Sequence, residues 1–143
     1  MYEHILISTD GSEVAQKGVD HGLELAKALQ AKVSVIMATD TRMLYIEQGT
    51  AWAYQEMADM QKAAAEKVLE GVRELARGMN IEADTICVEN ALPAEAIVEA
   101  AQSRKCGLIV MSSHGRSGVR RFILGSVASR VLALSEIPVL VVR

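Results

Sequence analysis

Two groups of small polar residues have the spacing expected of a phosphate-binding loop. Ser112 and Gly115 follow the apolar run 106–110, and after nine more residues Gly125 and Ser126 begin a helical pattern. Glycine lets the backbone approach an anion closely, and the N–H groups at a helix N-terminus supply donors and a favourable dipole. The stretch therefore predicts a strand, a phosphate-binding loop and a helix start. A glycine turn followed by a helix cap is the alternative interpretation.

Apolar runs and helical patterns alternate along the rest of the chain. The predicted strands cover residues 4–9, 33–38, 81–88, 106–111 and 139–142, and the predicted helices cover residues 13–30, 57–79, 93–101 and 126–135. This alternation predicts an α/β fold with a parallel sheet and right-handed crossovers. The length of 143 residues indicates one domain, 1–143. Residues 40–55 have no clear period, and we expect them to form a loop that carries Trp52 and folds over the ligand site; a loop that packs only on the next helix is the alternative.

Composition excludes several classes of protein. Half of the residues are hydrophobic, only 3% are aromatic and the net charge is −3, so the core is aliphatic and no basic surface for nucleic acid is expected. No apolar run reaches the roughly 20 residues of a membrane helix, and no signal peptide is visible. Cys87 and Cys106 are expected to be free thiols, and no metal-ligand set is apparent. These features predict a soluble cytoplasmic domain without membrane insertion.

The loop resembles the nucleotide loop of the universal stress protein family. That family has Gly-x-x-Gly, nine residues, then Gly-Ser or Gly-Thr, and this chain has Ser112-x-x-Gly115, nine residues, then Gly125-Ser126. The opening stretch 5–12 and the closing stretch 137–142 are also similar to the family. The resemblance therefore covers the whole chain.

Three positions depart from the family's pattern. Ser112 replaces the first loop glycine, Ala91 stands where a glycine is frequent, and Gly107 stands where an aspartate is common. Ser112 and Ala91 are the two that lie near the expected nucleotide. Both side chains are small, so we keep the expectation that the loop binds a nucleotide.

The resemblance implies a particular architecture. It is a single-domain open five-stranded parallel sheet of order 3-2-1-4-5 with helices on both faces, Rossmann-like and of the adenine nucleotide alpha hydrolase-like type. Ligands of open α/β sheets bind at the carboxyl ends of the strands where the strand order reverses. Here the reversal lies between the first and fourth strands, which end near Asp10 and Ser112. The expected ligand is ATP, or AMP or ADP, with Mg²⁺ accompanying the phosphates.

The resemblance also implies the site residues. Asp10 would accept hydrogen bonds from ribose or adenine, or cap a helix, and Ala38 would contact the adenine. The backbone of the loop would surround the phosphates, and no residue is expected to be catalytic or to bind a metal. The implied nucleotide-binding residues are Thr9, Asp10, Ala38, Met111, Ser112, His114, Gly115, Arg116, Gly118, Gly125, Ser126 and Val127.

Three functions compete at this stage. The leading one is a dimeric cytoplasmic stress-response module that binds ATP and turns it over negligibly. The alternatives are a stress protein without nucleotide that acts through protein contacts, and a slow ATPase or adenylyltransferase-like enzyme. The final strand, Val139–Val142, is apolar on both faces, and an uncovered apolar sheet edge is an aggregation hazard. The resemblance implies that this edge pairs with its twin in a homodimer.

Overall fold

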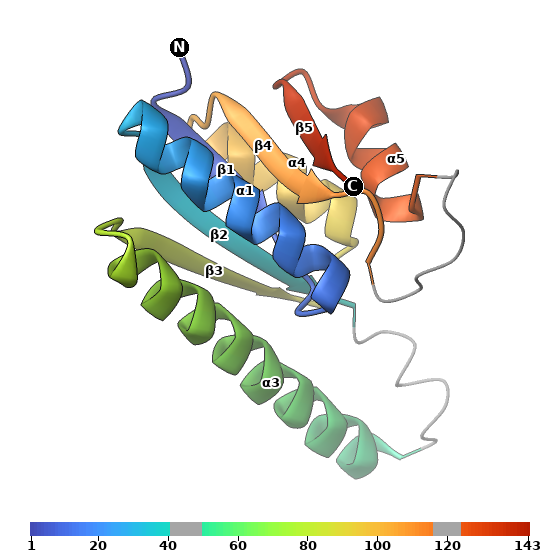
Figure 1. Cartoon of the computed structure of the whole chain (residues 1–143). Coiled ribbons are helices and arrows are strands. Elements are labelled where there is room, and N and C mark those ends of the chain that lie inside the picture. Colours follow the sequence, from blue (N-terminus) through green and yellow to red (C-terminus); the bar gives the residue numbers. More distant parts are fainter. Residues whose placement is uncertain (41–49, 116–123) are drawn as a thin grey trace.

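The computed structural model describes residues 1–40, 50–115 and 124–143. The elements in chain order are β1 (His4–Ser8), α1 (Glu13–Leu29), β2 (Lys32–Thr39), α3 (Ala51–Gly78), β3 (Ala83–Glu89), α4 (Pro93–Ser103), β4 (Leu108–Ser112), α5 (Ser126–Leu134) and β5 (Val139–Val142). They form one five-stranded sheet of order β3-β2-β1-β4-β5, and every pair of neighbouring strands is parallel. The predicted α/β fold and strand order are confirmed (Figure 1).

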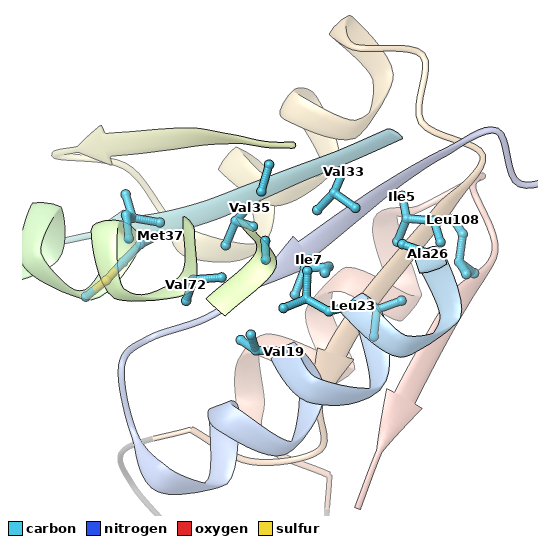
Figure 2. Close-up of a cluster of buried hydrophobic side chains, with 14 of the residues drawn as sticks. Ile5, Ile7, Val19, Leu23, Ala26, Val33, Val35, Met37, Val72 and Leu108 are labelled. Carbon is cyan, nitrogen blue, oxygen red and sulfur yellow. The ribbon is translucent and has the colours of Figure 1, made fainter. Parts of the chain in front are cut away.

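Helices cover both faces of the sheet. Helices α1 and α3 pack on one face, and α4 and α5 pack on the other (Figure 1). Successive residues of a strand point to opposite faces, so Ile5 and Ile7 join the first core while Leu6 joins the second. Figure 2 shows Ile5 and Ile7 facing Val19 and Leu23 of α1. All five side chains are fully buried, which fixes the central strand between two layers of helix.

Helix α1 packs unusually close to the sheet beside the end of β4. A Cβ atom at Gly18 would lie 2.9 Å from the backbone nitrogen of Ser112, and one at Gly22 would lie 2.6 Å from Cδ1 of Ile7. The helix begins after Ser12, whose side chain accepts a hydrogen bond from the N–H of Ala15 at 3.1 Å. The backbone of α1 therefore supports the point where the predicted phosphate loop begins.

Helix α3 begins earlier than its sequence pattern indicates. The predicted start near residue 57 is wrong, because the Thr50 side chain accepts the N–H of Ala53 at 3.3 Å and caps a helix from Ala51. The buried residues of α3 all lie in its second half, so its first turns pack no side chain into the core. Trp52 lies in the first turn, 75% exposed. Residues 41–49 of the expected loop lie outside the described residues. No described helix, α3 included, has the length and apolarity to cross a membrane.

The two cysteines are free, as the sequence predicts. Cys106 is buried, and burial raises the pKa of its thiol. Burial also raises the pKa of Cys87, which is only partly covered, and the nearby carboxylates Glu89 and Glu66 raise it further. A thiol reacts as its thiolate, so both side chains behave as small apolar groups at neutral pH.

Candidate functional site

A cavity of about 290 Å³ lies at the carboxyl ends of β1 and β4, where the strand order reverses. Its lining residues are Ser8, Thr9, Asp10, Ala15, Ala38, Pro93, Ile97, Met111, Ser112, Ser113, His114, Gly115, Gly125, Ser126, Val127 and Ala128. Every nucleotide-binding residue that the family resemblance implies lies in this lining, except Arg116 and Gly118, which fall outside the described residues. The fold thus brings Asp10, after β1, and the loop that begins at Ser112 to one place.

Asp10 and the beginning of the phosphate loop are in direct contact. A Cβ atom at Gly115 would fall well inside 3.0 Å of Oδ2 of Asp10, so the loop backbone lies against that carboxylate. The other carboxylate oxygen of Asp10 accepts the N–H of Ser12 at 3.0 Å. Asp10 therefore shapes the turn into α1 and lines the cavity, whereas the helix cap considered for it is supplied by Ser12.

The loop after β4 is held by hydrogen bonds on several sides. The Ser112 hydroxyl donates to the carbonyl of His114 at 2.6 Å, and the N–H of Gly125 donates to the carbonyl of Ser113 at 2.7 Å. The N–H of Ser113 in turn donates to the carbonyl of Val142 at 2.7 Å. These bonds connect residues 112–114, where the loop begins, to β5 and to the start of α5.

The N-terminus of α5 opens onto the cavity, and its N-cap residue supplies no side-chain cap. Gly125 occupies the N-cap position and makes no side-chain capping bond, and Ser126, Val127 and Ala128 of the first turn all line the cavity. The N–H groups of a first helical turn have no partner within the helix, and the helix dipole makes this end positive. This end of the cavity is suited to an anion.

Part of the cavity lining is apolar. Ala38 at the end of β2, Met111 of β4 and Pro93 and Ile97 of α4 contribute to it. Ala38 is small and leaves room for a flat group beside the sheet. Sequence reasoning did not identify Pro93 and Ile97 as lining residues, because their place in the cavity depends on how α4 packs across the sheet. The sequence signal that could have placed them there is Pro93 itself, which marks the start of α4.

His114 begins the loop, and the described residues do not supply it with the partners of a catalytic base. Its Nδ1 lies 3.0 Å from the Ser113 hydroxyl, and its Nε2 is buried with no hydrogen-bond partner among the described residues. A general base is normally oriented by a carboxylate or another strong acceptor and lies beside the group that it deprotonates. The described contacts of this imidazole supply neither.

The described residues contain no group of three or more His, Cys, Asp and Glu side chains that could hold a metal ion. Among the described residues that line the cavity, Asp10 is the one carboxylate. A divalent cation at this site would therefore take most of its oxygen ligands from a bound phosphate and from water.

A second, larger hollow of about 980 Å³ lies at the other end of the strands. It is lined by charges of both signs, among them Lys32, Arg77 and Asp84, and by the C-terminal end of α3. Helix C-termini present carbonyl oxygens and a negative dipole end, which disfavour anions. Neither Asp10 nor any described residue of the phosphate loop lines this hollow.

His4 borders that second hollow, and both of its ring nitrogens lie within hydrogen-bonding distance of a protein oxygen. Its Nδ1 lies 3.1 Å from the carbonyl of Arg104, and its Nε2 lies 2.9 Å from the hydroxyl of Ser34, which is fully buried. Burial lowers the pKa of His4, and the positive charges of Arg104 and Lys32 lower it further, although its hydrogen bond to the Arg104 carbonyl opposes the shift.

Comparison with known proteins gives a consistent assignment. A model of the universal stress protein family matches residues 1–143. A universal stress protein of Methanocaldococcus jannaschii is 33% identical over 143 residues, covering 100% of this chain and 83% of the relative. The universal stress protein YxiE of Bacillus subtilis is 33% identical over 149 residues and is covered completely, as is this chain.

Solved structures agree with the fold. The hypothetical protein MJ0577, whose structure was used to assign its biochemical function, has a TM-score of 0.85 at 29% identity, covering 99% of this chain and 96% of that one. A universal stress protein in complex with cAMP has a TM-score of 0.74 at 24% identity, with coverage of 99% and 97%. One from Archaeoglobus fulgidus in complex with dAMP has a TM-score of 0.72 at 19% identity, with coverage of 99% and 98%. The chain therefore belongs to the universal stress protein family.

Proposed function

We propose that this protein is a cytoplasmic, nucleotide-binding stress-response module that holds ATP, or AMP or ADP, in the cavity between β1 and β4. The observation that carries the proposal is the N-terminus of α5, which begins after Gly125 and opens onto the cavity that Asp10 and Gly115 also line. Two structural relatives were solved with adenine nucleotides, which supports the same ligand class.

The cavity offers a different environment to each part of an adenine nucleotide. The phosphates would take hydrogen bonds from the backbone amides of Gly115, Ser126 and Val127, where the α5 dipole also favours negative charge. Asp10 would accept hydrogen bonds from the ribose hydroxyls, and the apolar lining around Ala38 would contact the base. Mg²⁺ would enter with the phosphates.

Turnover would be negligible on this account. Hydrolysis needs an oriented water, a group that positions it and neutralisation of charge on the leaving phosphate. His114 is the nearest imidazole, and its described contacts do not orient it as a base. His114→Ala is therefore expected to leave any trace of ATP hydrolysis nearly unchanged. Turnover near one per second that the substitution abolishes would instead favour an enzyme.

The β5 edge supports a homodimer. β5 is the outermost strand of the sheet beside β4, its Leu140 is 38% exposed, and Val139 and Val141 are only partly buried. Pairing of Val139–Val142 with the same strand of a second copy would satisfy the free backbone groups of this edge and cover these side chains.

The nature of the bound ligand is tested by extracting the purified protein with acid and identifying the released small molecules by mass spectrometry. The proposal predicts an adenine nucleotide in wild-type protein and its loss in Gly115→Asp, which places bulk and negative charge beside Asp10 and the phosphates. If the nucleotide-free wild-type protein also fails to bind added ATP, AMP and ADP, the protein belongs instead among stress proteins that act through protein contacts.

A further inference from the structure

Ser112 makes a contact that the family's glycine cannot make. Its side chain is buried at the end of β4, 8% exposed, and its hydroxyl donates to the carbonyl of His114 two residues later at 2.6 Å. This bond closes a small ring at the beginning of the phosphate loop. It holds the peptide that joins His114 to Gly115.

The orientation of that peptide decides what the loop presents to an anion. The described residues contain no cis peptide bond, so the N–H of Gly115 points opposite to the carbonyl of His114. A bond that fixes the carbonyl on the Ser112 side therefore fixes the amide on the other side. Within the described residues, the Gly115 amide has no protein acceptor. Rotation of this peptide would instead turn the carbonyl oxygen towards the position of the phosphate, where it repels negative charge.

We propose that Ser112 is a positioning residue for phosphate recognition, whose hydroxyl presents the Gly115 amide to the nucleotide before the nucleotide binds. This inference rests on the proposed function. The neighbouring carbonyl, of Ser113, is already held by the N–H of Gly125. Ser112 thus completes a loop in which two successive carbonyls are occupied by protein donors, and the ligand does not have to reorder the backbone.

The chain offers a matched control for this contact. Ser135 lies at the C-terminal end of α5 and also donates its hydroxyl to the carbonyl two residues later, that of Ile137, at 2.8 Å. It is partly buried and does not line the cavity. The same hydroxyl also accepts the N–H of Ile137 at 3.1 Å, so Ser135→Ala removes a bond of the same kind together with this second one, at a position outside the cavity lining.

The test measures the affinities of AMP and adenosine by calorimetry for wild type, Ser112→Ala, Ser112→Gly and Ser135→Ala. Adenosine lacks the phosphate, so it reports on base and ribose contacts alone. Both Ser112 variants are expected to bind AMP about three- to tenfold more weakly, the range for one hydrogen bond, and to bind adenosine as wild type does. Ser135→Ala is expected to bind both ligands as wild type does.

The outcomes separate this inference from the proposed function. If wild type binds AMP and Ser112→Gly binds it equally or more tightly, the positioning role is wrong and nucleotide binding stands. An equal loss of AMP and adenosine affinity in Ser112→Ala assigns the hydroxyl to general support of the fold and also overturns the role. If wild type binds neither ligand, the proposed function fails and this inference fails with it.

Discussion

Gly115→Ala tests the contact between Gly115 and the Asp10 carboxylate without adding charge. Ordinary van der Waals contact begins at 3.4 Å, and the new Cβ would lie well inside 3.0 Å of Oδ2 of Asp10, so the two groups must separate by several tenths of an ångström or more. Gly115 does not have a positive φ, so alanine adds no left-handed backbone strain there. The cost therefore arises from moving the carboxylate or the loop.

The size of that cost follows from what holds Asp10. Its Oδ1 accepts the N–H of Ser12 at 3.0 Å, and a hydrogen bond to a charged group contributes about 1.5–3 kcal/mol. If the carboxylate yields and this bond is lost, the free energy of unfolding falls by about that amount. For a chain of this size the melting temperature then falls by about 3–12 °C. If the loop yields instead, Gly115 moves away from the phosphate and nucleotide affinity falls.

Thermal unfolding of a double-mutant cycle measures the coupling between these two residues. Asp10→Ala removes the group that obstructs the new methyl, so Gly115→Ala is expected to be nearly neutral for stability in that background. An interaction energy of about 1 kcal/mol or more is expected between the two substitutions. Additive effects within about 0.5 kcal/mol, or an unchanged melting temperature and ATP affinity in Gly115→Ala alone, would refute the contact.

Three further predictions concern other parts of the chain. Gly18→Ala and Gly22→Ala should both destabilise the fold, but only Gly18→Ala should weaken ATP binding in calorimetry, because its methyl meets the backbone where the loop begins; equal affinities would contradict this. The pKa of His4 is lowered in the folded state, so the unfolded chain takes up the proton first; the contribution of His4 to stability is complete above the ordinary value of 6.5 and is lost as the pH falls from there through the lowered pKa of the folded state. Melting temperatures from pH 8 to pH 5 should therefore fall less steeply in His4→Gln, and identical profiles would exclude the effect. Leu140→Asp should convert the proposed dimer to a monomer in light scattering at micromolar concentration, and a wild-type monomer would reject the dimer.

The alternation of strands and helices was predictable because each core-facing pattern is local. The sequence of β1 shows apolar residues at successive positions, and this is the pattern of a strand buried on both faces. The strand order was not predictable from these local patterns. It came from the family resemblance, since periodicity says nothing about which strands are neighbours.

The site was predictable only in part. Asp10 and Gly115 lie far apart in the sequence, and the strand order is what places them together. Pro93 and Ile97 were not predicted as lining residues, because their position depends on the packing of α4. The expectation that Trp52 lies over the ligand is not supported, since it lies in α3 beside a shallow groove and outside the cavity lining. Thr50, the N-cap of α3, was the local signal for this helix start, and it was missed because the residues around it have no clear apolar period.

The most direct test of nucleotide binding at this cavity is an amide-resolved NMR titration of ¹⁵N-labelled, nucleotide-free protein with ATP. The account predicts saturable shifts that are largest at the amides of Gly115, Gly125, Ser126 and Val127, which line the cavity at the loop and the start of α5. No shifts at saturating ATP, or shifts confined to residues of the second hollow such as Asn80, would contradict it.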